Sequence, residues 1–414
     1  MAQIRLGFIG AGFVARFHAT ALHSVRGVEL AAVTRHAASP ALSEHAQRLG
    51  VGPCRIVDSV DELCRACDVV AILAPNFARV DVMEQIADAV PGGAELKGIM
   101  CEKPLGRTVA EARRLVELAR QIELPTAYLE NQLHMKAIKA ARAQLAPVAE
   151  TMGPPVLARS SEEHAGPHHG WFWDPTRQGG GALCDLACHS IAIGWYVLTP
   201  PGRDPVFLEP VNISAETSLL KWGQPRYRAE LLDRMGVDYA ATPAEDYCSG
   251  IVTFRNPESG QIVKAQFSNS WMYDKQGLRL TMDGLGPGYA FEVNSLRSPL
   301  EVFVADDAAT AVADAETALE KSTASRGLLA VAPNEADLYG YNDELDEAAH
   351  ALAAGRDAML NWDYGLAVTR LCQAAYLSAE RRAVVDLTDP ATDETLASYQ
   401  SLIAQGRGTE ILMR

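Results

Sequence analysis

A glycine-rich turn between an apolar strand and a helix constrains the fold of this 414-residue chain more than any other feature. Residues 4–9 have the alternation of a strand, and the G-x-G-x-x-A sequence of residues 10–15 follows directly. Such a turn needs Gly10 for its tight bend, Gly12 for close approach of a pyrophosphate, and Ala15 for close helix–strand packing. The phosphates would meet the positive N-terminus of the following helix. The cofactor-binding residues predicted here are Gly10, Gly12, Phe13 and Val14.

Short apolar runs and helical patterns then alternate through the first 130 residues. Strands are predicted at residues 4–9, 29–33, 69–73, 98–101 and 126–129, and helices at 13–24, 39–49, 80–89 and 109–121. This alternation is typical of a parallel sheet with helical crossovers. We therefore predict an α/β protein whose N-terminal Rossmann dinucleotide-binding domain spans residues 1–130.

The pattern changes after residue 131 and favours an α+β domain over residues 131–414, with a mostly antiparallel open sheet. This domain is expected to bind substrate and to mediate oligomerisation. Strands are predicted at residues 156–160, 211–214, 249–254, 261–268, 277–283 and 300–304, and helices at 134–145, 182–198, 342–354 and 363–382. Residues 306–325 also have a helical composition.

Composition excludes several classes of protein. A hydrophobic content of 48% with 21% charged residues fits a soluble globular protein, and a net charge of −15 argues against nucleic-acid and anionic membrane surfaces. No run approaches the roughly 18 apolar residues of a membrane span. Eight scattered cysteines predict reduced thiols in the cytoplasm, with core packing favoured over a redox or metal role for Cys64 and Cys67.

The end of the second strand bears on the choice of cofactor. An acidic residue about 20 positions after the glycine turn would bind the adenosine ribose of NAD, but the chain has Thr34-Arg35-His36 there. A hydroxyl followed by an arginine suits a 2′-phosphate, which favours NADP over NAD. Arg35 could instead stack on adenine, and NAD would then serve. Further along, Pro75-Asn76 follows a fourth strand-like run and is expected near the nicotinamide, with a turn-forming Asn as the alternative.

Two further motifs carry residues suited to chemistry. In Glu102-Lys103-Pro104, a lysine follows a buried strand and is held rigidly by its neighbours; Glu102 is expected to position Lys103 or the backbone. Downstream, Gly179-Gly180-Gly181 opens a helix on which Asp185 and His189 fall at i and i+4, on one face. The alternative interpretation is that Asp185 and His189 are a structural pair of side chains on the helix.

A zinc site competes for the same helix, because Cys184 and Cys188 lie beside Asp185 and His189. Ligands at i and i+4 would use only one of the two pairs, and no Cys-x-x-Cys complements them. We therefore predict no metal.

Together these motifs resemble the glucose-fructose oxidoreductase / inositol dehydrogenase / rhizopine-catabolism (Gfo/Idh/MocA) family. Matching the family pattern G-G-G-x-x-x-D-x-G-x-H residue by residue implies a catalytic trio of Lys103, Asp185 and His189. The chain departs from the pattern twice: Ala187 replaces the usual glycine, and Ala192 stands where many members carry an Asp.

The resemblance implies an NAD(P)-dependent oxidoreductase acting on a secondary alcohol or ketone of a sugar, cyclitol or sugar-acid derivative. His189 has the intrinsic acidity for proton removal, Lys103 can stabilise alkoxide character, and Asp185 can orient a hydroxyl. Whether Lys103 or His189 takes the proton stays open. The alternatives are a glycosidase that oxidises and then eliminates with bound NAD, and a non-catalytic cofactor-sensing regulator, against which the intact trio argues.

A loop over residues 162–175 is rich in His and Trp and is interpreted as a substrate wall, through His164, Trp171 and Trp173. Packing of the two tryptophans beneath the glycines is the alternative. Asn131 matches a family Asn and is expected to face the substrate, with a helix N-cap as the alternative. A sheet with one open face predicts a homodimer or homotetramer.

Overall fold

The computed structural model describes residues 3–275, 277–297, 301–304, 327–330 and 334–412. It divides into two compact units. The first contains Met1–Lys139 and Tyr339–Arg370, and the second contains Ala140–Leu338 and Leu371–Arg414. The division predicted at residue 130 lies nine residues before Lys139, and the return of residues 339–370 to the first unit was not anticipated.

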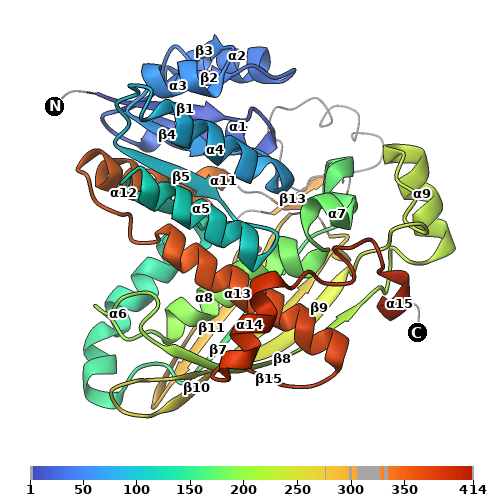
Figure 1. The fold of residues 1–414 in the computed structure, drawn as a ribbon. Helices are drawn as coiled ribbons and strands as arrows, with labels where there is room; N and C mark the ends of the chain where they lie inside the picture. The colour runs from blue at the N-terminus through green and yellow to red at the C-terminus, as the bar shows by residue number, and fades with distance from the viewer. Residues whose placement is uncertain (1–2, 276, 298–300, 305–326, 331–333, 413–414) are drawn as a thin grey trace. The chain divides into compact units, whose positions relative to one another are not determined.

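The first unit is built on a six-stranded sheet in the order β3-β2-β1-β4-β5-β6, and every neighbouring pair is parallel (Figure 1). The predicted Rossmann topology is confirmed, with the strand order reversing between β1 and β4, where such folds bind ligands. The strands are β1 (Ile4–Ile9), β2 (Val28–Thr34), β3 (Arg55–Val57), β4 (Val69–Ile72), β5 (Gly98–Glu102) and β6 (Thr126–Leu129). The helices between them are α1 (Phe13–Ala21), α2 (Ser39–Leu49), α3 (Val60–Ala66), α4 (Arg79–Ala89) and α5 (Val109–Gln121), with 3₁₀ turns η1 (Leu22–Ser24), η2 (Asn76–Ala78) and η3 (Asn131–His134).

A helix from late in the sequence completes this unit. Helix α12 (Tyr341–Ala353) contacts β5 and β6, and a Cβ added to Gly98 would lie 2.8 Å from the side chain of Leu352. The indole of Trp362 donates to the carbonyl of Ala127 at 3.0 Å. The segment therefore packs on the parallel sheet although about half of the chain separates them.

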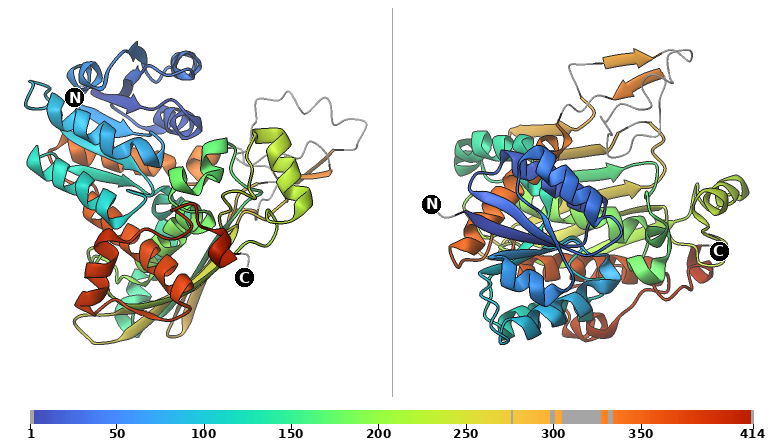
Figure 2. Two further views of the ribbon diagram at one scale, coloured as in Figure 1. Left: turned by 45° about the vertical axis from the view of Figure 1, so that its right-hand side comes forward. Right: turned by 90° about the horizontal axis from the view of Figure 1, so that it is seen from above.

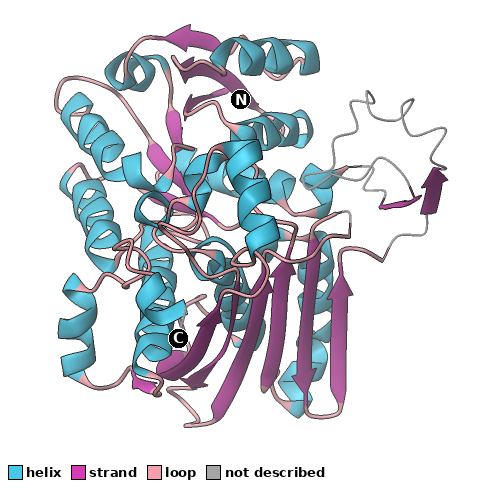
Figure 3. Ribbon diagram, turned by 90° about the vertical axis from the view of Figure 1, so that its right-hand side faces the viewer, coloured by secondary structure: helices cyan, strands magenta, loops and turns pink. Residues whose placement is uncertain are grey.

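The second unit contains a seven-stranded sheet in the order β12-β11-β7-β10-β9-β8-β15, whose strands lie side by side in Figure 3. Its neighbours are antiparallel except for β7 and β10, which confirms the predicted mostly antiparallel sheet. The strands are β7 (Leu157–Glu163), β8 (Glu209–Ser218), β9 (Tyr247–Arg255), β10 (Ile262–Ser270), β11 (Arg279–Gly286), β12 (Tyr289–Asn294) and β15 (Val385–Asp386), and β13 (Glu301–Val304) pairs separately with β14 (Gly327–Ala330).

Helices of the remaining chain are α6 (Lys136–Met152), α7 (Pro175–Gln178), α8 (Cys188–Leu198), α9 (Pro225–Met235), α11 (Glu335–Leu338), α13 (Trp362–Arg381), α14 (Pro390–Ser398) and α15 (Thr409–Leu412), with a 3₁₀ turn η4 (Gly170–Trp173). Both views of Figure 2 show α9 as an outlying helix of the second unit. Helix α6 continues through Pro147 to Met152, beyond the predicted end at residue 145. The helical composition of residues 306–325 lies outside the described residues.

Helix α8 covers one face of the sheet and positions the candidate site. It contacts β7, β10 and β11. The stretch Pro175–Leu198 is long and apolar enough to cross a membrane, but 94% of its apolar window is buried within the protein, as in the core helix of a folded domain. The turn directly before α8, Leu183–Ala187, is π-helical, a distortion often found at functional sites.

Candidate active site

The glycine turn leaves the approach to the N-terminus of α1 open. Gly10 has φ +112°, and a Cβ there would lie 2.8 Å from the backbone oxygen of Leu73, so only glycine fits. Gly12 is the N-cap of α1 and supplies no side-chain cap, and a Cβ built on it meets nothing within 4 Å. Phe13 is exposed and Val14 half-buried. Open space beside uncapped N–H groups fits a dinucleotide phosphate.

The end of β2 presents an arginine already paired with an acid. The amide of Gly10 donates to the Thr34 hydroxyl at 3.3 Å, so Thr34 supports the turn itself. Arg35 forms an ion pair with Asp58, and both side chains are largely exposed. Asp58 directly follows β3, a strand of three residues that the sequence pattern did not reveal. A carboxylate therefore stands beside the arginine expected to contact a 2′-phosphate.

Glu102 holds the backbone at Lys103. One carboxylate oxygen is 2.7 Å from Nε2 of the buried His18, and the other accepts from the Lys103 amide at 3.1 Å. Burial alone would raise the pKa of Glu102, but the hydrogen bond and charge of His18, with Lys103 and Arg79 nearby, bring that pKa below its ordinary value. Glu102 is thus an ionised anchor, and Lys103, half-buried, follows it directly.

Arg79, which the sequence reasoning missed, ties two loops of the first unit together. This buried guanidinium donates to the carbonyls of Ala74 at 3.2 Å, Glu102 at 2.6 Å and Lys103 at 3.1 Å, and also to that of Pro104. The Pro75-Asn76 segment after β4 is thereby fixed to the lysine segment after β5. Asn76 is buried at the start of η2.

Asn131 contacts the backbone of the segment that returns to the first unit. Its buried amide donates to the backbone carbonyl of Tyr339 at 2.8 Å, and Glu130, not Asn131, caps η3. A Cβ on Gly340 would lie 2.2 Å from the Asn131 carbonyl. These contacts favour an anchor for the returning segment over a substrate contact.

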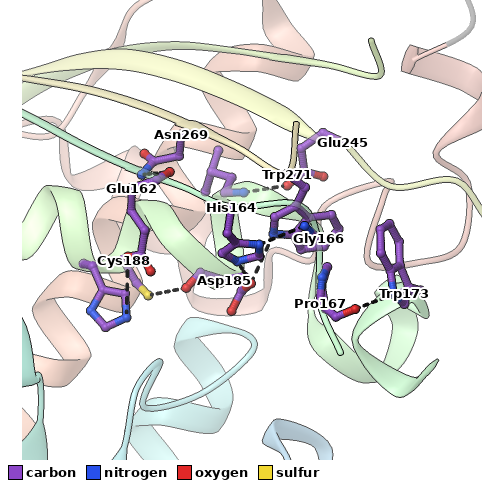
Figure 4. A network of polar contacts seen from close by, with 12 residues as sticks. Glu162, His164, Gly166, Pro167, Trp173, Asp185, Cys188, Glu245, Asn269 and Trp271 are labelled. Carbon is purple, nitrogen blue, oxygen red and sulfur yellow. Dashed lines mark hydrogen bonds and ion pairs between the residues drawn. The ribbon is translucent and has the colours of Figure 1, made fainter. Parts of the chain in front are cut away.

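In the second unit, Asp185 is contacted by a hydrogen-bond donor and by an imidazole from other parts of the chain. The indole Nε1 of Trp271 donates to Asp185 Oδ2 at 3.1 Å, and His164 Nε2 lies 3.7 Å from the same oxygen. His164 Nδ1 accepts from the Gly166 amide at 3.0 Å, so the proton of a neutral ring is on Nε2, toward Asp185. Figure 4 shows His164 and Trp271 converging on Asp185, which orients its carboxylate.

His189, one helical turn further on, faces an acid from the sheet. Its Nε2 lies 3.8 Å from Glu162 Oε2, and both side chains are buried. Glu162 is on β7 and separated from His189 by 27 positions in sequence, so no spacing pattern could have paired them. The π-helical turn before α8 carries Asp185, and α8 itself carries His189.

A buried carboxylate fixes the glycine turn that precedes these two residues. Glu245 Oε1 accepts from the amides of Gly181 and Leu183, each at 2.9 Å, and from the hydroxyl of Tyr376 at 2.6 Å. The Glu245 carbonyl accepts from the Ala182 amide at 3.0 Å. Burial raises the pKa of Glu245 to about 7, although these hydrogen bonds oppose the rise.

Comparisons with known proteins show the family of the chain. Residues 4–127 match the model of an oxidoreductase family with an NAD-binding Rossmann fold, and residues 140–285 match the GFO/IDH/MocA C-terminal domain. The chain belongs to the GFO/IDH/MocA oxidoreductase family. Its first unit is thus an NAD-binding Rossmann fold.

Relatives of this GFO/IDH/MocA protein include the 1,5-anhydro-D-fructose reductase of Ensifer adhaerens, 30% identical over 222 residues, which are 53% of this chain and 62% of that protein. D-glucoside 3-dehydrogenase of Escherichia coli (strain K12) is 29% identical over 205 residues, 48% of this chain and 55% of that protein. The chain therefore matches about half to three fifths of the length of these curated relatives. The crystal structure of GenD2 from gentamicin A biosynthesis, in complex with NAD, has a TM-score of 0.72 and 22% identity, covering 94% of this chain and 97% of that chain.

The structure places the predicted catalytic residues of this GFO/IDH/MocA protein in two groups. Lys103 lies in the first unit with the glycine turn, whereas Asp185, in the π-helical turn, and His189, at the start of α8, lie in the second. The two departures from the family pattern, Ala187 and Ala192, are both fully buried. The acid that lies beside His189 in this chain is Glu162, from β7.

The two tryptophans predicted to form a substrate wall differ in burial. Trp173 is 1% exposed; its indole donates to the Pro167 carbonyl at 3.2 Å, and its ring packs against the rings of Trp222, Tyr239 and Trp271. This burial favours the packing alternative for Trp173. Trp171 is half-buried and lies against Phe172, so it still offers surface.

All eight cysteines are buried, including those of the redox and zinc alternatives. Burial raises the pKa of the Cys64 and Cys67 thiols to about 12, which argues against a reactive thiolate pair. Over the described ranges, no group of three or more His, Cys, Asp or Glu side chains is arranged to hold a metal ion. Cys184 and Cys188 instead direct their thiols to the carbonyls of Gln178 and Asp185.

Proposed function

We propose that this protein is an NAD(P)-dependent dehydrogenase or reductase that acts on a secondary alcohol or ketone of a sugar, cyclitol or sugar-acid derivative. The observation that carries the proposal is the buried pair of Asp185 and His189, each facing a partner from a different strand or loop, in a chain with a dinucleotide turn. The relatives named as a 1,5-anhydro-D-fructose reductase and a D-glucoside 3-dehydrogenase support a sugar-like substrate.

The residues of this chain divide the chemistry between them. A nicotinamide cofactor, held at the turn of Gly10 and Gly12, would supply the hydride chemistry at the reacting carbon. His189 takes the hydroxyl proton as general base, and Lys103 donates a hydrogen bond to the oxygen as it gains alkoxide character. Asp185, held by Trp271 and His164, orients a neighbouring hydroxyl.

The open end of β2 supports NADP as the preferred cofactor. Arg35 stands where an acid would reject the 2′-phosphate, and Asp58 moderates its charge. We propose that the balance between these two exposed side chains sets the choice between NADP and NAD, with the phosphate-bearing cofactor favoured.

The exposed face of the sheet supports a homodimer or homotetramer. Strand alternation places Arg159 and Ser161 on the face of β7 opposite Glu162, where they line a hollow of about 1110 Å³ together with Ser249, Gln266 and Thr281. We propose that a second copy of the chain covers this face and that the protein works in the cytoplasm, with its eight buried cysteines reduced.

A cofactor-reduction screen tests the proposal. The purified protein would be incubated with NAD⁺ or NADP⁺ and with glucose, glucosides, 1,5-anhydro-D-glucitol and inositols, and absorbance of the reduced cofactor followed. Reduction with a polyol supports the proposal. Cleavage of glycosides without net reduction would identify the oxidation–elimination chemistry instead, and cofactor binding with no turnover of any polyol in either direction would favour a sensor.

A further inference from the structure

Strand β7 presents two consecutive glutamates to opposite faces of the sheet. Ser160 and Glu162 are buried on the face that α8 covers, whereas Ser161 and Glu163 point the other way, as strand alternation requires. Glu163 pairs with Arg279 and accepts from the Ser270 hydroxyl at 3.3 Å. Glu162 faces His189 instead, with Oε2 at 3.8 Å from Nε2.

Hydrogen bonds between the strands and helix α8 fix the distance between Glu162 and His189. Asn269 on β10 donates from Nδ2 to the Ser190 hydroxyl at 2.8 Å and to the Glu162 carbonyl at 3.4 Å. The Ser160 hydroxyl donates to the Ser190 carbonyl at 2.7 Å. Because Ser190 directly follows His189, these bonds hold the imidazole and the carboxylate in register. Figure 4 shows Glu162 and Asn269 side by side above the helix.

Two buried acidic side chains belong to this cluster. Glu162 is 5% exposed and Asp185 is 6% exposed, so two carboxylates lie out of water near the same helical face. A buried carboxylate is costly unless a cation or hydrogen bonds compensate it. Asp185 receives the Trp271 indole and faces His164, whereas the Glu162 carboxylate faces His189 at 3.8 Å.

We propose that Glu162 is the positioning residue of His189: it holds the imidazole and stabilises the imidazolium that forms when His189 takes the proton of the substrate hydroxyl. This inference rests on the proposed function. In the step, the C–H bond breaks and its hydride goes to the oxidised nicotinamide, while the O–H proton goes to His189. Glu162 takes no proton; its negative charge pairs with the imidazolium, as the acid does in an Asp–His pair. Among the contacts seen in the described residues, the charged groups of this cluster are Glu162 from β7 and Asp185 from the turn before α8, with His164 against Asp185.

A titration by nuclear magnetic resonance tests the pairing without any substrate. The ten histidines would be labelled with ¹⁵N, and the His189 signals identified by their loss in His189→Ala. We expect Glu162→Gln to lower the midpoint of the His189 titration by about one to two pH units, because an opposite charge at this range favours the charged form. Glu163→Gln is the matched control and should leave the midpoint in place. An unchanged midpoint in folded Glu162→Gln protein would overturn the pairing.

Glu162→Asp is the second variant, for the case in which Glu162→Gln does not fold. It keeps the charge on a side chain shorter by one methylene, so the His189 midpoint should lie between those of the wild type and a neutral variant. A midpoint equal to that of the wild type would contradict a contact that depends on distance.

Kinetics then connect the pairing to turnover, using the best polyol of the cofactor-reduction screen. Glu162→Gln should move the acid limb of kcat/KM to lower pH and reduce kcat by roughly 10–10²-fold, about tenfold for each pH unit of lost stabilisation. KM should change little, and in a His189→Ala background the Glu162 substitution should have no further effect. If His189→Ala itself keeps near-wild-type turnover, the proposed function of His189 fails, while the magnetic resonance titration still decides the pairing.

Discussion

Glu245 should make the stability of the second unit depend on pH. Its carboxyl is fully buried and accepts from two backbone amides and from Tyr376, and burial raises its pKa from the ordinary 4.5 to about 7. The folded state then binds the proton more tightly than the unfolded chain does. The contribution of Glu245 to the free energy of unfolding is therefore fully present below about pH 4.5 and is lost as pH rises through about 7.

The size of the effect follows from the same two values. A tenfold change in proton affinity corresponds to about 1.4 kcal/mol, so the difference between 4.5 and about 7 corresponds to about 3 kcal/mol. Glu245→Gln cannot titrate, and its amide oxygen can still accept from Gly181, Leu183 and Tyr376. The substitution changes the free energy of unfolding by an amount that does not vary with pH. The difference in this free energy, wild type minus variant, should therefore fall by up to about 3 kcal/mol between about pH 4.5 and pH 8.

Urea unfolding followed by tryptophan fluorescence measures this difference, since five of the six tryptophans belong to the second unit. Glu258→Gln is the control, because that carboxylate is exposed and pairs only with Arg203 among the contacts seen here; its difference from wild type should stay flat. A difference between wild type and Glu245→Gln that is also flat across this pH range would refute the reasoning about Glu245.

Three further outcomes test the cofactor site and the assembly. Gly12→Val should abolish cofactor binding in calorimetry, because its side chain would occupy the open space at the N-terminus of α1; unchanged affinity in a folded variant would remove the site. Arg35→Asp should raise the relative kcat/KM with NAD, and Asp58→Asn should raise it with NADP, so unaffected ratios in both would contradict the role of this pair. Light scattering at micromolar concentration should give the mass of a dimer or tetramer, and a monomer would count against the covered sheet face.

Local sequence signals were sufficient for much of the fold. The glycine turn and the apolar runs of the parallel strands act over a few residues, and the structure has them where they were expected. Strand β3 was missed because Arg55–Val57 is too short to show a period.

The partners of the site were beyond any local pattern. Glu162, Trp271 and Glu245 reach the helix of Asp185 and His189 from separate strands and loops, so only the folded sheet brings them together. The return of α12 to the first unit is of the same kind, since the helix pattern was visible in the sequence but its packing surface was not. The burial of Trp173 could not be predicted either, because the sequence of an aromatic loop does not distinguish rings that face a ligand from rings that pack in the core.

The central claim is that Lys103 and His189 carry the chemistry, and turnover in their alanine variants tests it most directly. Neither residue belongs to the phosphate turn, so cofactor affinity measured by calorimetry should stay near that of the wild type. With the best polyol of the screen, Lys103→Ala and His189→Ala should each lower kcat by roughly 10²–10⁴-fold, the range for losing a positioned acid–base group. Near-wild-type kcat in both folded variants would contradict the account.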